Sequence, residues 1–263
     1  MSPDGRYLVA TRVTFGTPDE ASDTTLWLVN LATGEGRDLT PTLDLWPDSP
    51  VWSPDSTAVF FTADRDGRVA VLSVDLADAK VTTLVTEGAN SDLCPSPDGE
   101  TVYALQSSIM RPARIVRFDA HTADQSAVEL PNGIGEGGKA AKGGLAASSS
   151  VERLTAKAAD GTDISSCLVL PPDASPEKPA PLVLFVHGGP LGTWAGWHWR
   201  WNPHLLTERG YAVLMPDPAI SLGYGQQMVQ RGWGKWGEAP YTDVMAATDA
   251  ALARPDLARP GRR

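Results

Sequence analysis

The spacing of hydrophobic and polar positions divides the chain into two unlike halves. Up to about residue 130, short alternating or apolar runs recur, and this pattern predicts β-strands. The clearest runs cover residues 25–30, 68–75 and 113–119, and each is followed by a shorter run, at 36–39, 80–85 and 126–130. Beyond residue 150, longer apolar runs alternate with helical spacing, which predicts an α/β layer.

One turn motif repeats in the first half. Ser-Pro-Asp occurs at residues 2–4, 53–55 and 96–98, and a strand follows each copy. Proline presets φ and aspartate caps the turn, so the motif folds the chain back tightly. Short antiparallel strands recurring at roughly 40–50 residues are typical of β-propeller blades. A generic antiparallel sandwich is the alternative.

Three blades do not close a ring of about 4–8. The first motif also stands at the very start of the chain, so the strand before it is expected to be missing. We therefore expect a propeller fragment of about three partial blades over residues 1–135. Between residues 131 and 150, Gly, Ala, Ser and Lys replace apolar residues, which predicts a flexible linker over 136–150 and a second domain over 151–263.

The second domain is expected to begin with two strands, at 151–158 and 164–170, around the turn Asp160-Gly161. The apolar runs 182–186 and 211–215 predict buried strands of a mostly parallel sheet, and the first reads as buried on both faces. Helices are predicted at 204–209 and 241–253. In the second helix Asp243 is expected to stabilise the helix dipole, and the residues expected to share one face are Val244, Thr248, Ala251 and Leu252.

Composition and charge exclude several classes of function. The net charge is -10, whereas a nucleic-acid-binding protein needs a basic face. No apolar run approaches the ~20 residues of a membrane span. Cys94 and Cys167 lie in different halves and are expected to be free, buried thiols. Because the chain opens with turn chemistry in place of a signal peptide, a cytoplasmic location is expected.

The best candidate for chemistry is His187-Gly188-Gly189-Pro190, directly after the apolar run 182–186. In α/β-hydrolases an H-G-G stretch at this place supplies a backbone N–H to the oxyanion hole. The donor stabilises the oxygen that becomes negative in the tetrahedral intermediate, and glycines let the backbone approach the substrate closely. An ordinary glycine-rich exit from a strand is the alternative.

Further motifs follow in order: Gly223-Tyr224-Gly225-Gln226, Arg231-Gly232-Trp233-Gly234 and Pro240-Tyr241-Thr242-Asp243. With the repeats before them, they resemble the prolyl oligopeptidase family, in which a propeller precedes an α/β-hydrolase domain. The resemblance implies a serine-type peptidase acting on short or N-acylated peptides, without a cofactor, a bound metal, nucleic acid or a membrane. It implies oxyanion-hole donors at Gly189 and Gly188, and a substrate pocket with His187, Trp194 and Tyr224.

The chain departs from the family at two points. Where many members have Arg-Gly-Ser, this chain has Ala219-Ile220-Ser221, which weakens any inference about substrate contacts there. No G-x-S-x-G pentad occurs, and the histidine that should follow the serine is absent too. All four histidines precede Ser221, namely His121, His187, His198 and His204. We therefore expect a fragment cut at both ends, without the catalytic triad and inactive alone.

Two other functions remain open on the same residues. An esterase or another acyl hydrolase would use the same fold. A propeller that has lost its catalytic half would serve as a non-enzymatic binding protein. Four tryptophans are expected to fill the core or the contact between domains, with an aromatic wall of the substrate pocket as the alternative: Trp194, Trp197, Trp199 and Trp201.

Overall fold

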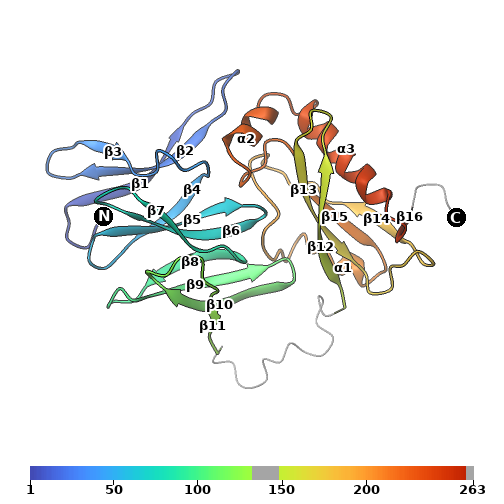
Figure 1. The fold of residues 1–263 in the computed structure, drawn as a ribbon, viewed down its shortest axis with the longest axis horizontal. Helices are drawn as coiled ribbons and strands as arrows, with labels where there is room; N and C mark the ends of the chain where they lie inside the picture. The colour runs from blue at the N-terminus through green and yellow to red at the C-terminus, as the bar shows by residue number, and fades with distance from the viewer. Residues whose placement is uncertain (132–147, 259–263) are drawn as a thin grey trace.

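The computed structural model describes residues 1–131 and 148–258. These residues form two parts, one with strands β1–β11 and one with strands β12–β16 and three helices (Figure 1). Among the described residues, no sheet contains strands from both parts. Most of the linker expected over 136–150 lies outside the described residues, and its last residue, Ser150, already begins strand β12.

The strands of the first part form three antiparallel meanders, and one parallel pair, Val69 with Ala89, joins the second and third meanders into a single sheet. The first meander comprises β1 (Tyr7–Thr14), β2 (Asp23–Asn30) and β3 (Gly36–Asp38). The second comprises β4 (Pro47–Trp52), β5 (Ala58–Arg65), β6 (Arg68–Asp75) and β7 (Val81–Val85). The third comprises β8 (Ala89–Pro95), β9 (Thr101–Ser108), β10 (Arg111–Asp119) and β11 (Val128–Glu129). The predicted strands are confirmed, with small shifts at their ends.

The second meander is buried on both of its faces. Val59 and Phe60 are neighbours in β5 and point to opposite sides, because side chains alternate along a strand. Val59 joins a core with the first meander, which includes Leu26, Leu28, Phe61 and Leu72. Phe60 joins a core with the third meander, which includes Val71, Leu84, Val102, Val116 and Phe118. The three meanders are therefore stacked face to face through apolar side chains.

The three Ser-Pro-Asp turns share one set of hydrogen bonds. The serine hydroxyl donates to the aspartate carboxylate at 2.6, 2.6 and 2.5 Å in the turns of Ser2, Ser53 and Ser96. The same hydroxyl accepts the N–H five residues on, and the carboxylate accepts the N–H two residues beyond the aspartate. The capping role predicted for aspartate is confirmed, and the serine proves to be its partner.

The second part is built on a five-stranded sheet in the order β12-β13-β15-β14-β16. β12 (Ser150–Lys157) and β13 (Asp163–Leu170) form the predicted hairpin, and β13 also pairs antiparallel with β15 (Ala212–Asp217). β14 (Ala180–Leu184) runs parallel to both β15 and the two-residue β16 (Leu257–Ala258). Figure 1 shows the long helix α3 (Ala239–Leu252) across one face of this sheet.

The helices differ from expectation more than the strands do. α1 (His204–Thr207) is shorter than predicted, and α2 (Gln226–Gly232) was not predicted at all. In α3 the buried residues are Pro240, Asp243, Ala247 and Ala251, so the predicted face is rotated. Asp243 lies beyond the first turn of α3, and its buried carboxylate forms an ion pair with Arg231, so the expected role of stabilising the helix dipole is wrong.

Two expectations about burial are also wrong. The apolar run 182–186 is not buried on both faces, since β14 ends at Leu184 and the side chains of Leu184 and Val186 are 36% and 53% exposed. Beyond Pro181, β14 has only β15 beside it among the described strands, and Leu184 and Val186 line an open cleft. Cys167 is buried as expected, but Cys94 is exposed, and both thiols are free. None of the described helices is long and apolar enough to cross a membrane.

The two parts meet through loops. The turn between β5 and β6 donates the Asp66 N–H to the carbonyl of Gly223 at 3.0 Å. Asp44 of the first part accepts the N–H of Gln226 at 2.7 Å. On another side of the contact, His204 Nε2 donates to the carbonyl of Ile109 at 2.8 Å. These hydrogen bonds set the position of the second part against the meanders.

Candidate active site

The H-G-G-P loop leaves the sheet at the carboxyl end of β14. Phe185 still donates its N–H to the carbonyl of Leu214 in β15 at 2.8 Å, and the loop departs from there. Among the described residues, no hydrogen bond uses the N–H of Gly188 or Gly189 as its donor. Gly189 has a φ of 129°, and a Cβ added to it would lie 3.1 Å from the carbonyl oxygen of Leu191. The backbone of this loop is therefore suited to glycine and leaves two adjacent donors free.

A cleft of about 670 Å³ opens beside this loop. Its walls are residues 184–188 and 192–194, with His198 and Trp201. Trp194 is 6% exposed, and its ring lies 6.3 Å from that of Phe185 and 6.2 Å from that of His187. The fold thus brings together three of the predicted site residues, Gly188, His187 and Trp194.

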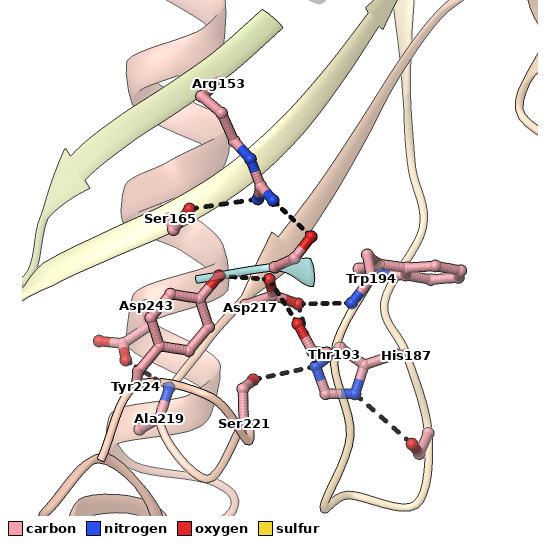
Figure 2. Close-up of polar contacts among 12 residues, drawn as sticks. Arg153, Ser165, His187, Thr193, Trp194, Asp217, Ala219, Ser221, Tyr224 and Asp243 are labelled. Carbon is pink, nitrogen blue, oxygen red and sulfur yellow. Dashed lines mark hydrogen bonds and ion pairs between the residues drawn. The ribbon is translucent and has the colours of Figure 1, made fainter. Parts of the chain in front are cut away.

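Asp217 ends β15 and is fully buried behind the loop (Figure 2). Its Oδ2 accepts the hydroxyls of Thr193 at 2.9 Å and Tyr224 at 2.7 Å, and its Oδ1 accepts the Trp194 N–H at 3.0 Å. Burial raises the pKa of Asp217, while these donors and His187 act in the opposite direction. A buried carboxylate held by three donors anchors the segment that follows the H-G-G-P loop.

His187 is hydrogen-bonded to Ser221, with 2.9 Å between Nε2 and Oγ (Figure 2). The order of residues along the chain had left Ser221 without a histidine, but the fold brings one to it from upstream. The same Nε2 also faces Oδ1 of Asp217 at 3.7 Å. In a catalytic triad the serine and the acid contact different ring nitrogens. Ser221 is moreover fully buried.

Residues 219–221 are held by a second buried carboxylate. Ala219 donates its N–H to Asp243 at 2.8 Å, and Arg231 forms an ion pair with the same carboxylate through both of its terminal nitrogens. Ile220 has a φ of 78°, in the region that glycine adopts at least cost. This is the place where the resembling family has Arg-Gly-Ser, so the structure gives a backbone reason for glycine there.

Tyr224 lies apart from the other predicted pocket residues. Its hydroxyl is bound to Asp217, and it lines a different cleft, of about 870 Å³, between the two parts. The three residues expected to form one pocket therefore lie in two clefts, with His187 and Trp194 in one and Tyr224 in the other. Asp217 is hydrogen-bonded to residues of both clefts. Sequence reasoning missed Asp217 as the connection, although it stands in the motif Pro216-Asp217-Pro218 directly after a predicted strand.

The tryptophans have mixed roles. The Trp197 ring is stacked on that of His204, with 5.5 Å between the ring centroids. The backbone N–H of Trp197 donates to the hydroxyl of Ser107 in the first part at 3.4 Å. Trp194 is buried against the sheet and also lines the cleft beside the H-G-G-P loop, so it combines the expected packing role with the alternative, a wall of that cleft. Trp199 and Trp201 are 71% and 51% exposed, so neither fills a core in this structure.

Comparisons with known proteins agree with this architecture. Residues 197–262 match the prolyl oligopeptidase family. Dipeptidyl-peptidase 5 of Porphyromonas gingivalis is 28% identical over 231 residues, which cover 88% of this chain and 33% of that protein. The probable dipeptidyl-peptidase 5 of Aspergillus clavatus is 30% identical over 213 residues, 77% of this chain and 28% of that protein. The chain thus spans about a third of the length of these relatives.

Solved structures match the fold over almost the whole chain. The acylaminoacyl peptidase of Pyrococcus horikoshii has a TM-score of 0.77 at 18% identity, and the match covers 97% of this chain and 38% of that one. Dipeptidyl peptidase 4 of Porphyromonas gingivalis has a TM-score of 0.67 at 19% identity, with 94% and 34% covered. From its sequence relatives and its fold together, the chain belongs to the prolyl oligopeptidase family of peptidases.

Proposed function

We propose that this chain is part of a serine peptidase and that its H-G-G-P loop supplies an N–H to the oxyanion hole. The observation that carries the proposal is the pair of free N–H groups of Gly188 and Gly189 after the carboxyl end of β14, where Gly188 lines an open cleft. In acyl transfer such donors stabilise the charge that develops on the carbonyl oxygen. Removal of one donor of this kind costs about 10²–10³ in kcat.

The pairing of β16 with β14 bears on where in the sheet a nucleophile would lie. In α/β-hydrolases the serine stands on a strand-to-helix turn at the same end of the sheet as the H-G-G loop. Leu257 and Ala258 pair in parallel with Ala180 and Pro181 of β14. This pairing places β16 beside β14, the strand that leads to the H-G-G-P loop. We propose that the triad is not among these 263 residues and that they are inactive on their own.

Ser221 is the alternative with a specific observation in its favour, its hydrogen bond with His187. Two observations count against it as a nucleophile. It is fully buried, so a substrate carbonyl cannot approach its Oγ. The nitrogen that it contacts is also the one that faces Asp217, so the acid cannot orient the ring from the opposite side.

We further propose that the three meanders are blades of a propeller that limits access to the cleft. The burial of the second meander on both faces supports this, because every blade inside a propeller is packed between two others. The names of the relatives favour short peptides, either with a free amino terminus or N-acylated, as the substrate class. An esterase activity would use the same oxyanion donors.

The test uses the natural reading frame that contains these residues, at its full length. We expect it to hydrolyse dipeptidyl or N-acylated p-nitroanilides and to bind a fluorophosphonate at a serine in a G-x-S-x-G pentad. Residues 1–263 alone should do neither. Gly189→Ala should lower kcat by about 10²-fold with little change in KM, because its Cβ displaces the loop.

Gly161→Ala is the matched control. Gly161 also has a positive φ, of 87°, in the hairpin of β12 and β13, but a Cβ there meets nothing within 4 Å. A full-length protein without hydrolytic activity would contradict the peptidase proposal and favour a binding protein. Labelling of residues 1–263 that is lost in Ser221→Ala would overturn the assignment of the nucleophile to another segment.

A further inference from the structure

The turn between β5 and β6 is the point where the first part touches the second near the candidate site. The Asp66 N–H binds the carbonyl of Gly223 at 3.0 Å. In return, Arg153 of β12 donates to the carbonyls of Asp66 and Gly67 at 3.0 and 2.7 Å. The turn is thus held from both sides by the second part.

Glycine at this contact leaves room for a side chain on one side and for backbone on the other. A Cβ on Gly67 would lie 2.0 Å from a guanidinium nitrogen of Arg153, so that side chain would have to move away from the turn. A Cβ on Gly223 would lie 2.9 Å from the backbone nitrogen of Arg65. A methyl group on Gly67 therefore displaces the Arg153 clamp, and one on Gly223 presses on the backbone of the β5–β6 turn.

Tyr224 connects this contact to Asp217. It follows Gly223 directly, and its hydroxyl donates to Asp217 at 2.7 Å. Ser165, which accepts a hydrogen bond from Arg153 at 3.4 Å, also contacts the Tyr224 hydroxyl. Figure 2 shows two of these contacts, Arg153 with Ser165 and Tyr224 with Asp217.

Asp217 carries the connection on to the glycine loop. The carboxylate that receives Tyr224 also receives Thr193 and the Trp194 N–H, and it faces His187. Loss of the Tyr224 donor leaves a fully buried acceptor short of one hydrogen bond. The carboxylate then compensates through its remaining donors, all of which belong to the segment 187–194.

We infer that Tyr224 and Asp217 are positioning residues, which couple the docking of the β5–β6 turn to the orientation of the Gly188 and Gly189 N–H groups. The inference rests on the proposed function in so far as these groups are the oxyanion donors. The two states are the turn docked on Gly223 and Arg153, and the turn released from them. In the released state the loop loses the geometry that the docked state imposes.

The test is a double-mutant cycle read by NMR on the 263-residue chain. Gly67→Ala releases the turn from the first part's side without touching the site, and Tyr224→Phe removes only the connecting hydroxyl. The measured quantities are the chemical shifts of the Gly188 and Gly189 amides. We expect Gly67→Ala to shift both resonances.

The cycle separates coupling from local damage. In the Tyr224→Phe background, Gly67→Ala should have no further effect on the two amides, since the connection is already cut. Gly34→Ala is the matched control, because Gly34 has a φ of 76° in the β2–β3 turn and a Cβ there meets nothing within 4 Å. It should leave both amides unchanged.

The inference is overturned if Gly67→Ala leaves the glycine amides unchanged, or if its effect is equally large in the Tyr224→Phe background. If Gly67→Ala does not fold, Arg153→Ala takes its place in the cycle, because it removes the same clamp without changing the backbone. The readout does not depend on turnover. A full-length protein without peptidase activity would therefore contradict the proposed function and leave this coupling intact. If the enzyme is active but the effects of Gly67→Ala and Tyr224→Phe on the two amides are additive, the coupling is contradicted and the proposed function is left intact.

Discussion

Ile220 combines an unfavourable backbone with a buried side chain. Its φ of 78° lies in the left-handed region, which costs a β-branched residue about 1–2 kcal/mol or more. Its side chain is only 2% exposed, and the preceding Ala219 N–H is fixed by Asp243. The conformation persists because burial and the Asp243 carboxylate together determine it.

These two contributions predict the effect of Ile220→Gly. Glycine relieves the backbone strain, but the substitution also removes a buried aliphatic side chain, which costs about 2–5 kcal/mol with the cavity left behind. We expect a net loss of about 1–3 kcal/mol in the free energy of unfolding, measured by urea titration with tryptophan fluorescence. Ile220→Val, which keeps the strain and most of the volume, should lose less. A more stable glycine variant would mean that strain outweighs packing here.

At the residue scale, the sequence identified the glycine loop and not what holds it. Gly188 and Gly189 could be identified from the sequence, because glycines directly after an apolar run indicate a loop at the end of a strand. Asp217 and Asp243 could not be identified in this way, because their partners Thr193 and Ala219 lie 24 residues away in each case. A carboxylate near a helix start normally reads as exposed, and nothing in the local pattern indicated that Asp243 is buried.

At the scale of elements, the Ser-Pro-Asp turns make a prediction about acid. The Ser96 hydroxyl and the Glu100 N–H lower the pKa of Asp98, and the equivalent serine does so for Asp55 and for Asp4, whose pKa is about 2. A carboxylate with a lowered folded-state pKa stabilises the fold above its unfolded value near 3.9, and this contribution disappears as pH falls through the folded value.

The Ser96→Ala variant should therefore lose less stability than the wild type when the pH is lowered into the acid range. The variant is expected to be less stable than the wild type at pH 7, and the difference should shrink as the pH falls below about 4 and Asp98 becomes protonated in both. The measurement is the midpoint of urea unfolding at several pH values. Ser126→Ala, at an exposed serine outside the three turns, serves as the control. A difference that stays constant down to pH 2 would contradict the role of the serine as partner of the carboxylate.

Strands could be predicted here and one helix could not, for physical reasons. Alternation of side chains gives strands such as β6 a local signature. Helix α2 has seven residues and follows Gly225, without a side-chain cap, so neither its length nor its start is marked. The run 182–186 was expected to be buried on both faces because it is continuously apolar, but burial depends on elements that lie beside it in space.

At the scale of the whole molecule, two acids of the first part, Asp48 and Asp64, face the contact between the two parts. Asp64 of β5 lies in a cavity of about 480 Å³ with Asp48 and Leu222. Burial, the Asp217 carboxylate and Asp48 raise the pKa of Asp64 to about 6. The folded protein therefore binds a proton here at a pH where the unfolded chain does not.

This raised pKa predicts a stability maximum in mild acid. Between about pH 6 and pH 4, protonation of Asp64 should stabilise the fold as pH falls, and above pH 6 the full cost of the charge remains. Asp64→Asn should be more stable than the wild type at pH 7.5, by about 1–2 kcal/mol, and equal to it near pH 4. Asp66→Asn is the control, because that side chain is exposed and its contacts use the backbone. The measurement is thermal unfolding of the variants and the wild type across this pH range. A difference between Asp64→Asn and the wild type that does not change with pH would count against a raised pKa of Asp64.

The turns of the first part have a consequence for how such a chain can evolve. Each one closes with side chains that lie within five residues of its own serine, so its folding does not depend on which copy it is. One hydrogen bond between the first two copies comes from the residue after the motif, since the Asp4 N–H binds the Ser56 hydroxyl at 3.1 Å. That position is Gly5 and Gly99 in the other two copies, so the contact between neighbours is not part of the repeated motif. A gene can therefore be lengthened by duplication of one unit, because a new copy brings its own closure, whereas its contact with a neighbour has to come from residues that differ between copies.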